Sequence, residues 1–279
     1  MRHTKKILRT AAAVLCCMFL CSVLCPSALA VSYTTDSNYD GTVFFDRLID
    51  VELTGDPRID IVNVAFSQYG YCESDSSKEL SGMKPGMDNY TEYGHQYGVQ
   101  SLWCAMFVSW CAKQANISED VIPSHAFTPI GVLWFMDRGQ SYTRSQVENG
   151  VYTPQAGDLV YFKSATNNNI VNHVAIVIGY FDGYVYTVEG NVNFDPTCTD
   201  GGQVLVRSRH ISDPILRYFC VPAYESDAAH EVGAFFPAEN DPSPSEDILL
   251  PESTDTTAES IHTSGADAFS EKPQYSFIP

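Results

Sequence analysis

The chain has 279 residues, carries a formal net charge of −18 and is 44% hydrophobic. Nucleic acids and anionic membrane surfaces bind proteins through a basic footprint, so this charge excludes both as expected partners. The length and the many aromatic residues suit a single domain with a sizeable core.

The first thirty residues have the pattern of a targeting segment. Four basic residues precede an apolar run at 11–24, and Ala28-Leu29-Ala30 then supplies a small-x-small cleavage pattern. This arrangement predicts a secretory signal peptide at 1–30 rather than a membrane span. We therefore expect a mature chain that begins near Val31, has no membrane span and is secreted, either extracellular or associated with the cell wall. Losing the four basic residues takes its net charge from −18 to −22.

Residues 226–279 form a second distinct segment. They hold eleven Asp and Glu against the single Lys272, and their apolar residues come as isolated pairs. Such a composition buries too little surface to offset the entropy of ordering, so it predicts an acidic disordered tail. We expect a lead-in at 31–56 and one folded domain at 57–225.

Three helices are expected in the first half of that domain. Apolar residues recur at helical spacing over 57–71, and a loop at 73–100 leads to a second helix at 102–115. The third helix is expected at 129–137, with Thr128 as its N-cap.

After Gly150 the pattern changes to short runs rich in Val, Ile and Tyr. These runs predict strands at 159–162, 173–180, 184–188, 204–209 and 216–221. Phe181-Asp182-Gly183 is typical of a hairpin turn. Helices followed by a meander of strands predict an α+β fold, with the helix at 102–115 packed on an antiparallel sheet.

Five cysteines remain after residue 30: Cys72, Cys104, Cys111, Cys198 and Cys220. An odd number leaves at least one thiol unpaired in a secreted protein. Cys104 begins an apolar helical run, where unpaired backbone N–H groups and the helix dipole favour an anion. Cys111 lies two turns later on nearly the same stripe, so we expect it to pack in the core. Disulfide pairing among the four cysteines other than Cys104 is left open.

His173 precedes the most apolar of the expected strands and is the candidate general base for Cys104. The alternative is a capping or packed core histidine. Glu189 and Asn191 are two residues apart in the next strand, so they are expected to face the same way. Either is then placed to orient His173, although Glu-Gly-Asn is also an ordinary strand end.

A thiol nucleophile also needs donors for the oxyanion of the substrate. The backbone N–H of Cys104 is the first candidate, because a helix begins there. Gln96 and Gln100 in the preceding loop are candidates for the second donor.

Four segments resemble the CHAP family of cysteine amidohydrolases and peptidases: Trp103 to Cys111, Pro154 to Phe162, His173 to Val177 and Val188 to Asn191. The resemblance implies a papain-like fold and hydrolysis of amide bonds in bacterial peptidoglycan. The bond cut would lie between N-acetylmuramic acid and L-alanine, or within the stem peptide or cross-bridge. Cys104 matches the nucleophile of the family and His173 its base, while Glu189 and Asn191 match the residues that orient the base. The expected partner is a peptidoglycan peptide or muropeptide, bound by a monomer.

Two other classes share this machinery. One is a cysteine protease that acts on protein substrates, and the other is a catalytically inactive, secreted wall-binding domain. A different papain-like family of wall hydrolases is a further alternative, but such enzymes normally have a second histidine at the position where this chain has Glu189. Some CHAP relatives bind calcium through acidic residues beside the nucleophile, but residues 105–107 are Ala, Met and Phe. The chain also lacks Cys-x-x-Cys and His-Glu-x-x-His spacings, so no metal and no cofactor is expected.

Overall fold

A computed structural model of the chain describes residues 33–164, 167, 170–193 and 202–224. The expected signal peptide at 1–30, the expected tail at 226–279 and Cys198 lie outside these described residues. From Thr35 onward the described residues belong to one compact unit, which includes most of the expected lead-in. Within the described part of the chain, no helix combines the length and apolar character that crossing a membrane requires.

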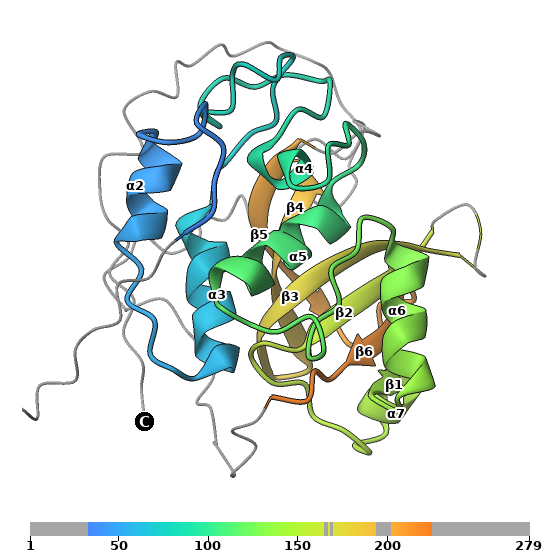
Figure 1. Cartoon of the computed structure of the whole chain (residues 1–279). Helices are drawn as coiled ribbons and strands as arrows, with labels where there is room; N and C mark the ends of the chain where they lie inside the picture. Colours follow the sequence, from blue (N-terminus) through green and yellow to red (C-terminus); the bar gives the residue numbers. More distant parts are fainter. Residues whose placement is uncertain (1–32, 165–166, 168–169, 194–201, 225–279) are drawn as a thin grey trace, which may run out of the picture. The chain divides into compact units, whose positions relative to one another are not determined.

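Six helices are described in this unit, and most of them begin at a side-chain cap. They are α2 (Val43–Ile49), α3 (Pro57–Ser67), α4 (Glu92–His95), α5 (Cys104–Gln114), α6 (Thr128–Asp137) and α7 (Arg144–Glu148) (Figure 1). The side chains of Thr42, Asp56, Thr91 and Thr143 accept backbone N–H groups at the starts of α2, α3, α4 and α7. Helices α5 and α6 have no such side-chain cap.

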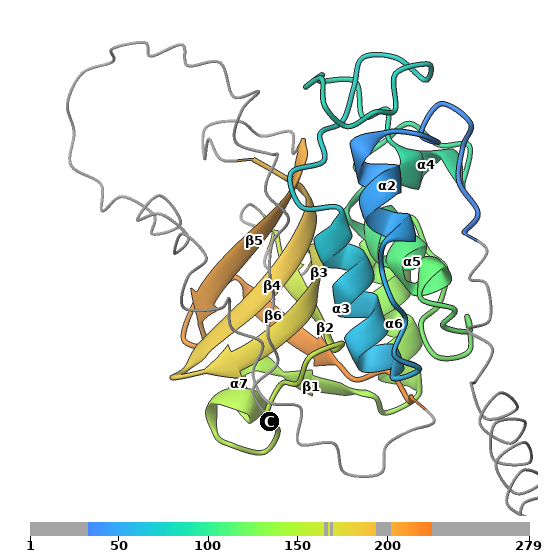
Figure 2. The same cartoon turned by 90° about the vertical axis from the view of Figure 1, so that its left-hand side faces the viewer.

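The strands form one antiparallel six-stranded sheet in the order β1-β6-β2-β3-β4-β5. They are β1 (Ser141–Thr143), β2 (Leu159–Lys163), β3 (Val171–Phe181), β4 (Tyr184–Val192), β5 (Gln203–His210) and β6 (Leu216–Cys220). Figure 2 shows α2, α3, α5 and α6 together on one side of β3, β4 and β5. The predicted α+β, papain-like arrangement, with the cysteine helix packed on an antiparallel sheet, is confirmed.

The β3–β4 hairpin has the turn that its sequence indicates. Phe181 pairs with Tyr184, and the two residues between them have positive φ angles, 49° at Asp182 and 79° at Gly183. A type I′ turn requires that conformation at both central residues, and Asp-Gly is one of its preferred pairs. This tight turn makes the strands of His173 and Glu189 antiparallel neighbours.

Several elements differ from the expected ones. The first expected helix ends at Ser67, four residues early, and α4 lies inside the segment expected to be a loop. Helices α2 and α7 and strand β1 are too short to show a period and were not expected. The expected N-cap at Thr128 is wrong: Phe127 occupies the cap position, and the Thr128 hydroxyl donates to the Val171 carbonyl at 3.0 Å.

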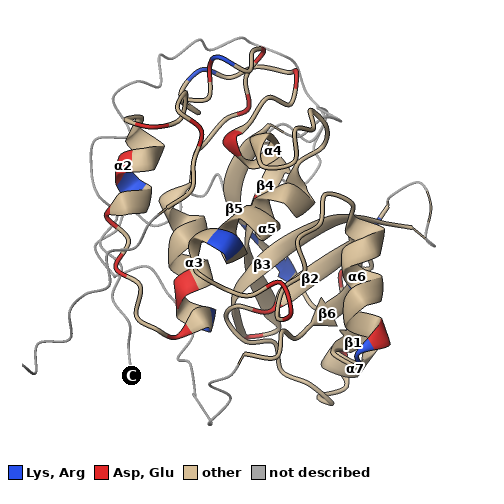
Figure 3. Cartoon of the chain, in the orientation of Figure 1, with Lys and Arg blue, Asp and Glu red and all other residues tan. Residues whose placement is uncertain are grey.

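Charged residues are unevenly distributed along the described elements (Figure 3). Glu189 is the only acidic residue within the described strands. Four basic residues share those strands: Lys163, Arg207, Arg209 and Arg217. The acidic residues of the described part lie instead in helices and loops, so the sheet is locally cationic in an acidic protein.

A buried ion pair joins α3 to the start of β2. The Arg58 guanidinium lies 2.8 Å from the Asp158 carboxylate, with the two side chains only 7% and 0% exposed. The second oxygen of Asp158 accepts from the Tyr152 hydroxyl at 2.6 Å and from the Gln155 N–H at 2.9 Å. Gly157 has a φ of 83°, and a Cβ there would lie 2.8 Å from Arg58 Cα. The Ala-Gly-Asp segment before β2 therefore anchors the helices to the sheet.

We expect Arg58→Met to destabilise the fold strongly, because it leaves the buried Asp158 carboxylate without its cation. Breaking a buried pair in this way costs about 3–5 kcal/mol. Urea unfolding followed by tryptophan fluorescence measures the loss. Arg144→Met is the matched control, since its pair with Glu148 is partly exposed, at 28% and 40%, and exposed pairs contribute about 0–1 kcal/mol. Equal losses in the two variants would contradict the anchoring role of Arg58.

Candidate active site

Cys104 is the first residue of α5, at a helix end that no side chain caps. The cap position belongs to Trp103, which makes no capping hydrogen bond. The first intrahelical bond runs from the Phe107 N–H to the Trp103 carbonyl at 2.8 Å, so it uses none of the earlier N–H groups. These N–H groups and the helix dipole favour an anion at the Cys104 side chain, which is 4% exposed.

Two contacts fix the position of this helix end. The Trp103 indole N–H donates to the Glu73 carboxylate at 2.8 Å in a fully buried setting. On the sheet side, a Cβ added at Gly190 would lie 2.7 Å from Phe107 Cβ and 2.8 Å from a ring carbon of Trp103. Contacts this short do not occur between real side chains, so only glycine lets α5 approach β4 this closely. The glycine between Glu189 and Asn191 is thus a packing requirement of the site.

His173 lies on β3 between the thiol and a carboxylate. Its Nε2 lies 2.8 Å from Glu189 Oε2, and its ring also interacts with the Cys104 side chain. Because Nε2 faces Glu189, Nδ1 is the ring nitrogen that faces the sulfur. Cys104 Sγ also lies 3.9 Å from the carbonyl oxygen of Asn172, the residue before His173. The expected neighbourhood of Cys104, His173 and Glu189 is present in the structure.

The Glu189 carboxylate is fully buried and held by three side chains. Thr187 donates to Oε1 at 2.7 Å, His173 faces Oε2, and the Arg209 guanidinium contacts both oxygens. Burial by itself raises the pKa of Glu189, but the charge of Arg209 and the hydrogen bond from His173 outweigh it and hold that pKa well below its usual range. Glu189 is therefore an anion that accepts the proton of His173 Nε2, which fixes the tautomer of the ring.

Opposing effects also set the charge of His173. Burial disfavours the imidazolium and lowers its pKa, whereas hydrogen bonds to Cys104 and Glu189, together with their charges, raise it more. The result is a pKa of about 9 for His173. An imidazolium next to a thiol at a helix N-terminus is the arrangement that favours a thiolate–imidazolium pair at neutral pH.

Asn191 differs from its expected position. The β4–β5 pairing has an irregularity between Glu189 and Val192, and Asn191 has a φ of 61°. Strand alternation does not hold across such a bulge, so two-residue spacing does not place Asn191 beside Glu189. Its buried Oδ1 has no hydrogen-bond partner, and it is Glu189 that contacts His173. A role for Asn191 in orienting the base stays a prediction.

The candidates for the second oxyanion donor are placed unequally. Gln100 Nε2 donates to the Asp88 carbonyl at 2.6 Å, which engages its amide away from Cys104. Gln96 is the C-cap residue that follows α4, and its buried Oε1 has no hydrogen-bond partner. The predictions for both residues remain untested.

Two further histidine and cysteine positions are structural. His125 is 3% exposed, and its Nδ1 lies 2.8 Å from the Pro123 carbonyl, so this ring is packed beneath α5 rather than beside the thiol. Cys111 is fully buried, and burial raises its pKa well above the usual value, as expected of a packing residue. The described cysteines, Cys72, Cys104, Cys111 and Cys220, are free thiols.

Thr187 and Arg209 also belong to the site, although neither was predicted from the sequence. Thr187 lies two residues before Glu189, and that spacing was a signal for a shared strand face. Arg209 offered no signal, because its contact with Glu189 depends on how β5 pairs with β4. Among the described residues, no group of three His, Cys, Asp or Glu side chains is arranged to hold a metal ion.

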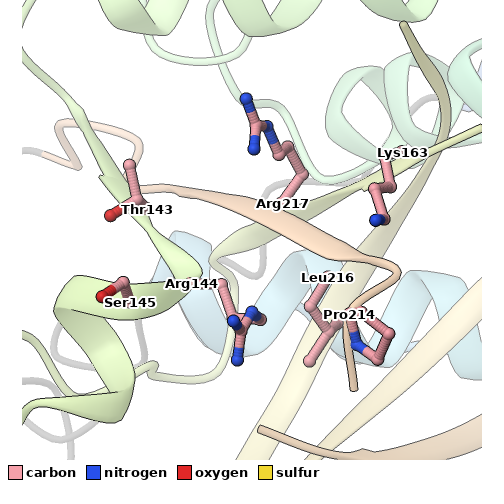
Figure 4. Close-up of a pocket in the computed structure, with 7 residues that line it drawn as sticks. All are labelled: Thr143, Arg144, Ser145, Lys163, Pro214, Leu216 and Arg217. Atoms are coloured by element: carbon pink, nitrogen blue, oxygen red, sulfur yellow. The ribbon is translucent and has the colours of Figure 1, made fainter. Parts of the chain in front are cut away.

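A shallow cavity of about 220 Å³ lies between α7, β6 and the end of β2 (Figure 4). Its lining residues are Thr143, Arg144, Ser145, Lys163, Pro214, Leu216 and Arg217. Arg144 donates hydrogen bonds to Glu148 and to the Ile211 carbonyl. Figure 4 shows the Arg217 side chain directed away from Arg144 and Leu216. The basic side chains therefore do not converge on one ligand position, and neither Cys104 nor His173 lines this cavity.

The fold and the site together define a class of protein. An α+β domain with a cysteine at a helix N-terminus, facing a strand histidine that a buried carboxylate orients, is a papain-like cysteine hydrolase domain. The CHAP domain family model matches residues 92–191, from the start of α4 to Asn191. The chain therefore contains a segment that matches the CHAP domain, whose family consists of amidases and peptidases. Searches of curated proteins and of solved structures each gave no match.

We expect Glu189→Gln to lower the rate of hydrolysis and to shift its pH dependence. Activity of the unmodified protein should fall as the pH rises through about 9, where the imidazolium of His173 loses its proton. Removing the negative charge lowers the pKa of His173, so this alkaline limb moves to lower pH. Loss of the correct tautomer should reduce kcat about 100-fold or more. A pH profile of kcat measures both effects, and an unchanged alkaline limb would contradict the role of Glu189.

We expect Gly190→Ala to displace the start of α5 from β4. The added methyl group overpacks the contact with Trp103 and Phe107, which costs about 1–3 kcal/mol, and it moves Cys104 relative to His173. Thermal melting and the rate of Cys104 alkylation measure the two effects. Gly55→Ala is the control, because Gly55 has a φ of 85° and open surroundings, so it loses stability through backbone strain alone. Full Cys104 reactivity in Gly190→Ala would be the contrary result.

Proposed function

We propose that this chain is a secreted cysteine hydrolase that cleaves amide bonds in bacterial peptidoglycan, with Cys104 as nucleophile. The observation that supports it most is the contact chain from Cys104 through His173 to Glu189, which lies within the CHAP domain segment. The amidase and peptidase activity of the family supports the reaction type. The secretory pattern of residues 1–30 supports an extracellular site of action.

The acylation step uses the helix terminus and the imidazolium. The Cys104 thiolate attacks the carbonyl carbon of the substrate amide and forms a C–S bond, and the carbonyl electrons move to oxygen. The Cys104 backbone N–H, free at the start of α5, donates to that oxyanion. The tetrahedral species then collapses, the C–N bond breaks, and His173 Nδ1 gives its proton to the leaving amine.

The deacylation step uses the same histidine as a base. Neutral His173 takes a proton from water at Nδ1, and the resulting hydroxide attacks the thioester carbon. The C–S bond breaks, the carboxylic acid product leaves, and the thiolate–imidazolium pair is restored. Glu189 remains ionised throughout because Arg209 and Thr187 hold it, so it stabilises the imidazolium without taking its proton.

Peptidoglycan as the substrate rests on the family and not on the electrostatics of the chain. A net charge of −18 gives no general attraction to anionic wall polymers. Recognition is therefore expected to act on the short peptide around the scissile amide. This favours limited cleavage of accessible stem peptides over extended movement along the wall.

Digestion of purified peptidoglycan tests this proposal. Mass spectrometry of the fragments should show a new amine at a peptide end, and either a free lactyl group on the sugar or a new peptide carboxylate. We expect Cys104→Ala to abolish these ends, while Cys111→Ala, on the same helix, retains cleavage. Cleavage that persists in Cys104→Ala contradicts the nucleophile. Cleavage of an unrelated protein in place of peptidoglycan would instead identify a cysteine protease.

A further inference from the structure

Arg209 reaches the site from an unusual distance along the sheet. In the β4–β5 register it lies opposite Val185, four residues before Glu189. Four residues of strand span about 13 Å, which exceeds the usual reach between diagonal neighbours on adjacent strands. Its guanidinium nevertheless contacts Glu189 Oε1 through Nη1 and lies 3.4 Å from Oε2 through Nη2. The side chain must therefore extend along the sheet towards His173.

Phe162 supports both ends of this contact. The Arg209 guanidinium carbon lies 4.7 Å from the centre of the Phe162 ring, and the His173 ring centre lies 5.2 Å from it. Cation–π contact of this kind favours Arg over Lys, because the planar guanidinium stacks on a ring while it donates in two directions. Arg209, Glu189 and His173 thus form one packed row across β5, β4 and β3.

We propose that Arg209 is a positioning residue of this site, which acts through Glu189 on the geometry and the charge of the Cys104–His173 pair. The inference rests on the proposed function of Cys104 as nucleophile, and it adds a fourth residue to the contact chain. Arg209 does not touch the sulfur or the substrate; its effect passes through the carboxylate.

The charge of Arg209 changes the balance around the thiol. Without it, the negative charge of Glu189 would cancel the positive charge of His173, and the thiolate would face a neutral pair. With it, the row of His173, Glu189 and Arg209 carries a net charge of +1, which favours the thiolate. Without this positive charge, both protons of the Cys104–His173 pair are harder to remove. Both limbs of the pH profile of the pair should therefore move to higher pH.

Other charged groups lie around this row on several elements. Arg207 shares β5 and interacts with the charge of Glu189, but its guanidinium donates to the Asn193 carbonyl. Asp213, after β5, interacts with the charge of Arg209, and Tyr69, after α3, interacts with Arg207. Cys104 on α5 and His173 on β3 complete the set. Of the two arginines in β5, Arg209 is the one that donates hydrogen bonds to the Glu189 carboxylate.

Alkylation of Cys104 by iodoacetamide tests the inference without any substrate. The rate is followed from pH 4 to 10 by mass spectrometry of chymotryptic peptides, because cleavage after Phe107 separates Cys104 from Cys111. In Arg209→Met both limbs should rise by about one pH unit, so alkylation on the acid side falls about tenfold. Arg209→Lys keeps the charge but has a shorter side chain and lacks the planar two-nitrogen fork of a guanidinium, so its limbs should move less. Arg217→Met, which removes an exposed cation from β6, should leave the profile unchanged.

Hydrolysis measurements separate positioning from a general loss of stability. We expect Arg209→Met to lower kcat at least tenfold, but to add little further loss in a Glu189→Gln background, because both changes break the same contact. Thermal melting of each variant confirms that it is folded. If Arg209→Met does not fold, the lower kcat of Arg209→Lys is compared with that of the unmodified protein instead.

Three results would overturn the proposal: unmoved limbs in folded Arg209→Met, an equal shift in Arg217→Met, or fully additive losses with Glu189→Gln. Failure of the proposed function has a different signature. If the unmodified protein alkylates with two limbs but cleaves no peptidoglycan, only the substrate is wrong. If it shows one limb at the position of an ordinary cysteine, both proposals fail.

Discussion

The buried charge of Glu189 is the constraint on which the site depends. An isolated carboxylate inside a protein is strongly disfavoured, so a fully buried Glu189 requires partners that supply hydrogen bonds and positive charge. Those partners come from three adjacent strands: His173 on β3, Thr187 on β4 and Arg209 on β5. The strand order β3-β4-β5, set by one type I′ hairpin and the following antiparallel pairing, is what brings them together.

The helix side of the site obeys a different constraint, which is steric. Gly190 follows Glu189 directly, and it is the point where α5 approaches β4 too closely for any side chain. The same strand segment therefore sets the carboxylate that contacts His173 and the surface against which the start of α5 packs. Because α5 begins without a side-chain cap, no capping oxygen accepts from its first N–H groups, which begin at Cys104. Two consecutive residues of β4 thus contact both sides of the site, Glu189 through His173 and Gly190 through α5.

The sequence predicts the parts of this structure that depend on local pattern. Apolar periods located α3, α5, α6 and all five of the longer strands within a few residues, and the Asp-Gly pair predicted the hairpin turn. Short elements such as α4 and β1 contain too few residues to show a period. The position expected for Asn191 relied on strand alternation, which a bulge interrupts. Arg209 was not predicted because it contacts a residue of the neighbouring strand four positions away from its paired residue, Val185. The reach of a long side chain and the position of a bulge depend on how the strands pair. Residue spacing along the sequence does not predict either of them.

Local charge, and not the net charge of the chain, controls the chemistry of this site. The protein is strongly acidic, yet its described strands hold one acidic residue and four basic ones. A second carboxylate in the row would oppose the thiolate, because each negative charge close to the sulfur favours the protonated thiol. The other acidic residues of the described part lie in helices and loops, and water and salt screen the solvent-exposed ones over about 8–10 Å. An acidic exterior is therefore compatible with a thiolate, provided that the strands facing it remain cationic and the one carboxylate among them is neutralised.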